Sequence, residues 1–550
     1  MRGLTETAAN AGASLLCFVG GQLPRDPARA SGRHRMYDLC SSRNVDGVVV
    51  LSSTLLHGVG QSALGRYCER YRPLPLCSIG VALPGFPSVT IDNEVGIRSV
   101  LQHAIVDHGA RRIAFVRGPR ANAEAELRVA AYEQTLAENG IPFDERLVVT
   151  GTFTIESGVE AVRALTDDRG VDLGELDAIA ASNDAMAMGV LLELERRGIG
   201  VPEQIAVVGF DDIDDARITQ PPLTTVRQPL ERLGHEALCV TLDWIRRGAQ
   251  PESRELPTEP VIRRSCGCAR PSGRAGPSLG PERSLGFEAA LLMKRDRIIG
   301  AMTKVARRAF ADAGSDWAER LVSALVADLR SPEPSAFVSA FDTLLERLLA
   351  RGVDLNLCDD VLGALRAQVV PILRSDRSRS ERAEDLFHLA RLATSHAIQR
   401  GLVRERLNVG RWSLAVNSTC TALASALDPS ELARRALELL PSLGISSCSA
   451  VVYDGASENS ARLLFGYADG ARLAAPASFD PSWIVPNGLR GAPARGASFV
   501  VLPLVFREHN LGHLLLELDL SHSYAYGAIA EAIGVGLYVG SGKGFPLPAI

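Results

Sequence analysis

The sequence predicts an α/β fold for its first half, followed by helices and then a small α+β region. In residues 1–265, near-continuous apolar runs alternate with segments of helical periodicity that end at glycines. Apolar runs of this kind are typical of parallel strands that helices cover on both faces. Because 550 residues exceed what one hydrophobic core accommodates, we expect about three domains.

Buried strands are expected at residues 44–53, 111–119, 175–184 and 204–212. Helices are expected between them, for example at residues 95–109 and 122–140, each of which ends at a glycine. In such sheets, ligands lie beyond the carboxyl ends of the strands. Asp211 and Asp212 directly follow the strand AVVGF, so we expect them where a ligand would lie.

The composition excludes several classes of protein. Hydrophobic residues make up 46% of the chain and charged residues 22%, which is ordinary for a soluble globular protein. The net charge of −5 gives no general affinity for nucleic acid. No apolar run of membrane-spanning length and no signal peptide are recognisable in the sequence, and its ten scattered cysteines form no CxxC pair. We therefore expect a cytoplasmic protein without membrane contact.

Cys266 and Cys268 flank a single glycine and could bind a metal or sense redox state. No histidine and no second cysteine pair is recognisable nearby, so we interpret them as two thiols at the end of a domain. We expect neither a metal site nor a cofactor. Catalysis is not expected either, because no nucleophile–base pair or metal-spaced cluster is recognisable in the sequence.

Several stretches resemble, in order, the sensor domain of the LacI/GalR (lactose- and galactose-repressor) family. They are HGARRIAFVRGP, AYEQTLAENGIPFD, AASNDAMAMGVLLELERRGIGVPEQIAVVGFDD and the continuation IDDARITQPPLTTVRQPLERLG. The resemblance covers residues 1–268 and rests on several motifs at the expected spacings. It implies a two-lobed fold like that of periplasmic sugar-binding proteins. It also implies a small polar effector, of the sugar or nucleoside class, in the cleft between the lobes.

The resemblance also implies ligand contacts. Arg128 matches an arginine that hydrogen-bonds the effector, and Asp211 resembles a carboxylate that accepts from ligand hydroxyls. Asn183 resembles a side chain that meets polar groups of the ligand, and Phe210 stands where a ring can stack on the ligand. Two of them have structural alternatives: Arg128 could be a surface charge of its helix, and Asp211 a helix N-cap.

Three further aspartates have structural interpretations. Asp92, in VTIDNEVG, is expected to cap the helix that follows it, and a role where the chain crosses between lobes is the weaker alternative. Asp214 and Asp215 are expected in a solvated turn.

The start of the sequence lacks two features that the resemblance implies. Regulators of this family carry an N-terminal helix-turn-helix, and no such motif is recognisable here. Residues 1–21 are expected to form the first helix of the sensor and the strand after it, so the first strand is missing. In the doubly wound strand order 2-1-3-4-5 that strand is central, and its loss would expose apolar surface. We expect an upstream start; the alternative is that another segment fills the gap.

The second half is expected to begin with a flexible linker at residues 269–284, which are rich in proline, glycine and serine. Apolar residues at helical spacing predict a helical bundle at residues 285–375. Residues 376–427 are expected to form one long signalling helix, with a dimeric coiled coil as a possibility. Residues 428–542 resemble a GAF-type domain in the order of their helices and strands, for which we expect an interaction role.

Together these features predict a cytoplasmic, non-enzymatic, ligand-sensing regulator that forms a homodimer. Effector binding would close the cleft, and the helical and GAF-like regions would relay closure to an output protein or domain. One alternative is a LacI/GalR-type DNA-binding repressor whose helix-turn-helix lies upstream, and DNA contact is expected only in that case. Another is the sensor part of a diguanylate cyclase or histidine kinase whose output domain is missing.

Overall fold

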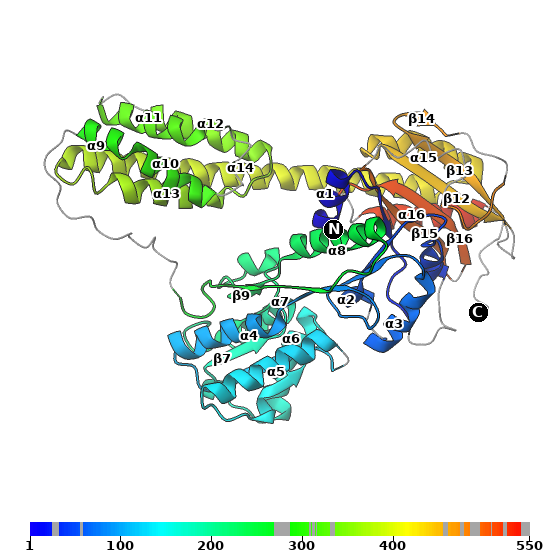
Figure 1. Cartoon of the computed structure of the whole chain (residues 1–550), viewed down its shortest axis with the longest axis horizontal. Helices are drawn as coiled ribbons and strands as arrows, with labels where there is room; N and C mark the ends of the chain where they lie inside the picture. Colours follow the sequence, from blue (N-terminus) through cyan, green and yellow to red (C-terminus); the bar gives the residue numbers. More distant parts are fainter. Residues whose placement is uncertain are drawn as a thin grey trace. The chain divides into compact units, whose positions relative to one another are not determined.

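A computed structural model of the chain forms two compact units (Figure 1). The first comprises Met1–Arg270 and Ala415–Ile550, and the second comprises Pro271–Leu414. The structure describes residues 1–24, 32–55, 59–120, 122–268, 287–306, 310, 314, 316–330, 336–454, 460–473, 478–484, 496–507, 509–520 and 525–540. The expected linker at residues 269–284 lies outside the described residues.

Two parallel sheets form the α/β part of the first unit and confirm the predicted α/β fold. The first sheet has the order β10-β4-β3-β2, with β2 (Val48–Leu51), β3 (Leu76–Ile79), β4 (Ser88–Ile91) and β10 (Arg254–Leu256). The second has the order β6-β5-β7-β8, with β5 (Ile113–Arg117), β6 (Val148–Thr150), β7 (Ala178–Ala181) and β8 (Ala206–Val208). Every residue of β5, β7 and β8 is buried, as their continuous apolar sequences require. Each sheet belongs to one lobe.

Helices cover both sheets. They are α1 (Arg2–Ala11), α2 (Ser52–Leu55), α3 (Gln61–Cys68), α4 (Asn93–Gln102), α5 (Ala123–Glu138), α6 (Ile155–Arg163), α7 (Asp184–Arg196) and α8 (Leu230–Arg247). In the second lobe, the rings of Phe115 on β5 and Tyr132 on α5 stack with centroids 4.7 Å apart. Gly158 lets α6 approach α7, because a Cβ atom there would lie 2.1 Å from the backbone oxygen of Met186. The helices thereby fix the strand ends at which ligands of this fold class are expected.

The first strand of the chain does not join the sensor sheets, which corrects the expectation from the sequence. β1 (Leu15–Phe18) pairs in parallel with β15 (Ser498–Phe506) of the C-terminal region, with Leu15 opposite Ser498. β2 is left at the end of its sheet, and among the described residues no strand pairs with its other side. The backbone N–H and C=O groups of a strand need hydrogen-bond partners, and the edge of β15 supplies them to β1.

A cavity of about 1450 Å³ lies between β1, β2, α8 and the C-terminal sheet. Its apolar walls include Leu15 and Phe18 of β1, Val48 and Val50 of β2, and Leu242 of α8. The apolar surface beside β2 is therefore a wall of a cavity in the first unit. No described strand pairs with the outer side of β2.

The C-terminal region adds a mixed sheet to the first unit, in the order β1-β15-β16-β12-β13-β14. Its further elements are α15 (Pro429–Ser442), β12 (Ser447–Asp454), β13 (Ser460–Ala468), β14 (Ala471–Arg472), β16 (His509–Glu517) and α16 (Tyr526–Gly540). All pairings in this sheet except that of β1 are antiparallel. The order of helix, strands and final helix is the one that the sequence predicts for residues 428–542.

The second unit is helical. Its elements are α9 (Phe287–Met293), α10 (Arg295–Ala306), α11 (Trp317–Arg330), α12 (Ala336–Ala350), α13 (Asn356–Val369) and the greater part of the 48-residue α14 (Arg377–Ala424). One core joins these helices, with the rings of Phe337 and Phe387 6.0 Å apart. The buried Asp328 accepts from the N–H groups of Ala336 and Phe337 at 3.0 and 2.9 Å and so caps the start of α12.

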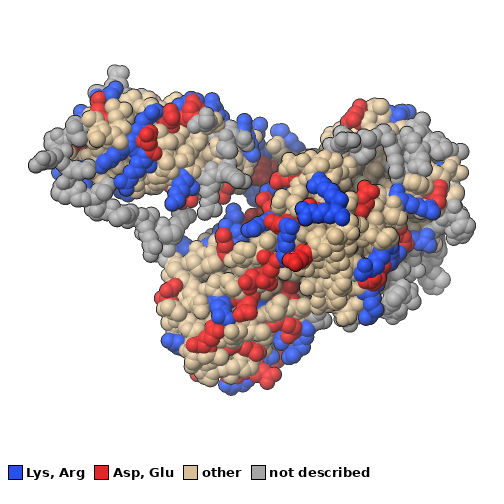
Figure 2. Space-filling model, in the orientation of Figure 1, with Lys and Arg blue, Asp and Glu red and all other residues tan. Residues whose placement is uncertain are grey.

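Acidic and basic side chains are interspersed on the face of the α/β lobes that Figure 2 shows. This pattern agrees with the small net charge of the chain. Among the described residues, no helix has the length and apolar character needed to cross a membrane.

Candidate ligand site

Arg128, Phe210 and Asp211 lie together where β7 and β8 end. Arg128 projects from α5, and its side chain is only 5% exposed, so it is not a surface charge. Its guanidinium carbon lies 3.9 Å from the centroid of the fully buried Phe210 ring. A guanidinium stacked on an aromatic face gains a cation–π attraction, which is strongest away from water. The structure thus brings three of the four sequence-predicted site residues together. Phe210, however, was expected to stack on the ligand and instead is fully buried with its ring against Arg128.

Hydrogen bonds hold the Arg128 guanidinium in place. Nε donates to Oδ1 of the buried Asn93 at 2.8 Å, and Nη1 donates to the backbone oxygen of Ser182 at 2.6 Å. Nη2 lies 3.9 Å from Oε1 of Glu124, one turn earlier on the same helix. Because a guanidinium carries five N–H groups, these contacts position it while further donors remain for a ligand.

Asp211 occupies a strained backbone position directly after the strand. Its φ angle is 125°, a region that residues other than glycine seldom adopt and that is often found at functional sites. Gln228 Nε2 donates to Asp211 Oδ1 at 2.5 Å, and the backbone N–H of Asp211 donates to Val226 at 2.8 Å. Burial raises the pKa of Asp211 to about 6, although the positive charge of Arg128 opposes the rise. The next helix, η8 (Asp214–Arg217), has Ile213 and not Asp211 at its N-cap.

Asn183 is the fourth predicted residue, and its side chain is engaged with the backbone. It is the N-cap of α7, where Oδ1 accepts from the N–H of Met186 at 3.0 Å. Its Nδ2 donates to the backbone oxygen of Phe153 at 3.3 Å. These contacts explain why an asparagine suits this position without any ligand.

The remaining acids have structural partners or are solvated. Asp212 forms ion pairs with Arg227, at 2.7 Å, and with Arg263. Asp92 accepts from the N–H of Val95 at 2.9 Å, which confirms that it caps α4. Asp214 and Asp215 are exposed in η8.

Asp184 is a buried acid to which the sequence reasoning gave no role. Its Oδ1 accepts from Thr225 Oγ1 at 2.5 Å, and its Oδ2 accepts from the N–H of Ile213 at 3.0 Å. Burial raises the pKa of Asp184 to about 7, and the nearby negative charge of Asp211 adds to the rise. Asp184 therefore holds the loop that carries Asp211 in place. Its burial near a second carboxylate disfavours the ionised form of Asp184.

Polar residues from both lobes complete the site. Ser53 Oγ, in the lobe of β2, donates at 3.0 Å to Oε2 of Glu124 in the lobe of β5. The sequence reasoning missed Ser53, Asn93, Glu124 and Gln228. Glu124 stands four residues before Arg128 on one helix face, a signal that could have found it. Ser53 and Asn93 follow strand ends, and no spacing in the sequence relates them to Arg128.

The site therefore combines one buried cation with two carboxylates and two amides. Glu124 and Asp211 can accept hydrogen bonds, whereas Arg128 can only donate them. Such a set matches a ligand whose hydroxyl groups both donate and accept. A site lined in this way rejects a ligand that leaves its buried polar groups unpaired.

Cys266 and Cys268 were interpreted as isolated thiols because no histidine was recognisable near them in the sequence. The structure shows that this reason is wrong. His103 and His108 lie beside them, and the ligand atoms of all four residues are within 4.8 Å of one another. The two pairs are about 160 residues apart in the sequence, so no local spacing connects them.

The α/β part of the chain is similar in sequence to known proteins. A family model of the periplasmic-binding-protein-like domain matches residues 103–266. The HTH-type transcriptional repressor CytR of Escherichia coli (strain K12) is 31% identical over 271 residues, which are 48% of this chain and 74% of the repressor. This chain belongs to the LacI family of transcriptional regulators.

Further relatives of this LacI-family chain are regulators as well. The HTH-type transcriptional regulator CelR of Thermobifida fusca is 35% identical over 42% of this chain and 66% of its own length. Among solved structures, a CelR–cellobiose complex is 33% identical over 42% of this chain and 70% of the other, with a TM-score of 0.38. A LacI family transcriptional regulator from Mycobacterium smegmatis is 26% identical over 48% of this chain and 92% of the other, with a TM-score of 0.42.

Proposed function

We propose that this chain is a non-enzymatic regulator that binds a small hydroxylated effector, of the sugar or nucleoside class, between its two lobes. The observation that carries the proposal is the buried Arg128, stacked on Phe210 and held beside the carboxylates of Glu124 and Asp211. Ser53 reaches Glu124 from the other lobe, so a ligand at this point would contact both lobes. An effector that contacts both lobes favours the closed arrangement through its higher affinity for it.

The effector class can be tested by thermal-shift screening of the full chain. The panel should contain monosaccharides, disaccharides including cellobiose, nucleosides and linear polyols. A compound that binds the folded chain raises the midpoint of unfolding in a concentration-dependent way. We expect at least one hydroxylated compound to do so, and equal shifts for wild type and Arg128→Lys would contradict the proposed site.

The affinity for that compound should depend on pH through Asp211. Its pKa of about 6 means that the carboxylate becomes protonated as the pH falls through that value and then no longer accepts from ligand hydroxyls. We expect the affinity to fall by roughly tenfold for each pH unit below 6. Isothermal titration calorimetry between about pH 5 and about pH 8 measures this slope.

Asp211→Asn should bind weakly at every pH in that range, because its amide cannot replace the carboxylate. Asp215→Asn is the matched control, since Asp215 is an exposed acid of the same loop. Asp215→Asn should keep both the affinity and the slope of the wild-type chain. An Asp211→Asn chain with the wild-type slope would assign the titration to another group.

For the output, we propose transcription regulation by a homodimer, with cytoplasmic location. CytR and CelR are both HTH-type regulators by name, which supports a DNA-directed role. Direct DNA contact by this protein would require a helix-turn-helix. The helical unit and the GAF-like C-terminal region would relay lobe closure, and the pairing of β15 with β1 ties the latter to the N-terminal part of the chain.

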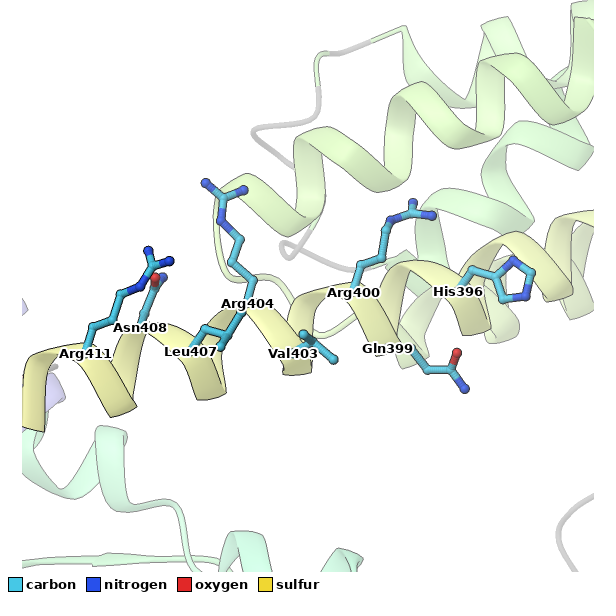
Figure 3. Close-up of a pocket in the computed structure, with 8 residues that line it drawn as sticks. All are labelled: His396, Gln399, Arg400, Val403, Arg404, Leu407, Asn408 and Arg411. Carbon is cyan, nitrogen blue, oxygen red and sulfur yellow. The ribbon is translucent and has the colours of Figure 1, made fainter.

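The surface of α14 supports the proposed homodimer. Val403, Leu407 and Leu414 recur at intervals of four and seven residues and are 59%, 55% and 72% exposed. Figure 3 shows Val403 and Leu407 on this helix with the arginines Arg400, Arg404 and Arg411. Apolar residues at this spacing form the seam of a coiled coil, and a second copy of α14 offers the same seam.

We expect Leu407→Asp to shift the monomer–dimer equilibrium at least tenfold toward monomer. In the dimer, the introduced carboxylate would be buried in the seam without a positively charged partner. The free-energy cost of removing it from water would therefore oppose dimerisation. Sedimentation velocity across a concentration series measures the shift. Glu405→Lys, also on the exposed part of α14 but opposite the seam, should leave the equilibrium unchanged. A wild-type chain that stays monomeric at high concentration would contradict the dimer.

A further inference from the structure

A cluster of two histidines and two cysteines lies at the opposite end of α4 from the effector site. His103 is the first residue of the π-helical segment η4 (His103–Asp107), which continues α4, and His108 directly follows that segment. Cys266 and Cys268 follow β11 (Glu259–Val261), the last strand of the sensor part. Asn93, the first residue of α4, contacts Arg128. The cluster is therefore separate from the effector site and has no part in the function proposed above.

The four side chains converge on one point. His103 Nε2 lies 3.2 Å from His108 Nε2 and 3.4 Å from the Sγ atoms of both Cys266 and Cys268. Cys268 Sγ lies 3.3 Å from His108 Nε2. An imidazole nitrogen has a single lone pair and cannot accept three hydrogen bonds, so hydrogen bonding alone does not account for this convergence.

Four of the six distances between the ligand atoms are close to the edges of a tetrahedron around a metal ion, and all six are within 4.8 Å. Zinc binds histidine nitrogen at about 2.0–2.1 Å and cysteine sulfur at about 2.3 Å. A regular tetrahedron with these bonds has N–N edges of roughly 3.3 Å and N–S edges of roughly 3.6 Å. We propose that His103, His108, Cys266 and Cys268 bind one Zn²⁺ ion.

Neighbouring groups orient the ligands. The carboxylate of Asp107 lies 2.6 Å from His103 Nδ1 and can only accept, so Nδ1 carries the proton and Nε2 presents its lone pair to the metal. Thr224 Oγ1 donates to Cys266 Sγ at 3.1 Å, as expected for a thiolate ligand. Gly267 has φ 103°, and a Cβ atom there would lie 3.3 Å from His108 Nδ1. Glycine between the cysteines thus allows the turn and leaves room for the histidine.

The donor set favours zinc and a structural role. Two thiolates and two imidazoles in a tetrahedron are typical of Zn²⁺, and hard cations prefer oxygen ligands. Four protein ligands leave no open position for a substrate. The metal would join the C-terminal end of the sensor part to α4, and so fix the place where the chain leaves this lobe.

Metal analysis of the full chain tests the proposal. Protein purified under reducing conditions, loaded with zinc and passed through gel filtration should retain about one zinc per chain. His108→Ala and Cys268→Ser should retain less than about a tenth of that amount. Cys239→Ser is the matched control, because Cys239 is also partly exposed and lies 3.7 Å from a histidine, His235, outside any such cluster. It should retain zinc like the wild-type chain.

Cobalt replacement and one conservative variant complete the test. Co²⁺ in the wild-type chain should give the intense visible bands of a tetrahedral site and a thiolate charge-transfer band, and Cys268→Ser should lose both. His108→Cys should keep zinc, because three cysteines and one histidine also bind zinc tetrahedrally. This variant keeps the test valid if His108→Ala fails to fold. A reduced wild-type chain that retains no zinc, or ligand variants that retain as much as wild type, would overturn the proposal.

Discussion

Replacing Arg128 with methionine is expected to abolish binding of the effector identified by the thermal-shift screen and to destabilise the α/β part. The substitution removes the donor proposed to hold the ligand, so the affinity should fall at least a hundredfold. It also leaves Asn93 Oδ1 and the oxygen of Ser182 without their donor and deprives Asp211 of a nearby positive charge. Lost partners of buried polar groups cost about 1–3 kcal/mol each. Calorimetric titration and thermal unfolding measure the two effects.

Arg146→Met is the control for this change. Arg146 is largely exposed and pairs with Asp144 at 2.7 Å, so its loss should change the free energy of unfolding by no more than about 0.5 kcal/mol. Effector affinity should be unaffected. Arg128→Lys should fold better than Arg128→Met, because it keeps the charge, but should bind the effector weakly because it lacks the planar guanidinium. Wild-type affinity in either Arg128 variant would place the effector elsewhere.

The stability of the α/β part is expected to fall as the pH rises, through the ionisation of Asp184. Its pKa is about 7 in the folded chain, against an ordinary value of 3.8, because it is buried near Asp211. The unfolded chain therefore loses this proton at lower pH than the folded chain. The contribution of Asp184 is favourable below about pH 4 and is lost as the pH rises through about 7. At 1.36 kcal/mol for each pH unit, the loss is on the order of 4 kcal/mol.

Asp184→Asn isolates this contribution. Asparagine cannot ionise, so the midpoint of unfolding should vary less between about pH 5 and about pH 8 than in the wild-type chain. The variant loses an acceptor for the N–H of Ile213 and should be less stable than wild type at the acidic end. Asp168→Asn, at an exposed position, should keep the wild-type pH profile. Parallel profiles for Asp184→Asn and wild type in scanning calorimetry would show that Asp184 does not titrate in this range.

The buried strands of the sensor could be predicted because burial on both faces leaves a direct mark on the sequence. β5, β7 and β8 are continuous apolar runs, and each lies inside a segment expected to be a strand. The cap of α4 at Asp92 was equally local, since an N-cap depends only on the next few residues. Signals of this kind need no knowledge of distant contacts.

The partner of β1 could not be predicted, because pairing depends on which edge is available and not on the strand itself. The sequence LLCF was expected in the sensor and instead lies beside β15, almost 500 residues later. The run of apolar residues is compatible with either sheet. The exposed edge of β15 offers hydrogen-bonding groups that local sequence does not reveal.

The effector site and the histidine–cysteine cluster also depend on contacts between residues that are far apart in the sequence. Ser53 and Glu124 meet across the lobes, and Cys268 meets His103 over 165 positions of sequence. Only the fold brings these residues together, so spacing alone could not find them. Arg128 and Asp211 were predicted through the family resemblance, and the structure has a buried, oriented cation and a half-buried carboxylate with a strained backbone at these positions.

Hydrogen–deuterium exchange of the full chain, with and without the effector from the screen, tests the central claim most directly. If the two lobes close on a ligand held by Arg128 and Asp211, protection should rise in the first turns of α5, at residues 210–213 and around Ser53 on the other lobe. The contrary result would be protection confined to β1 and β2, around the 1450 Å³ cavity, with α5 unchanged. That pattern would place the ligand in the gap beside β2 and remove the basis for effector recognition between the lobes.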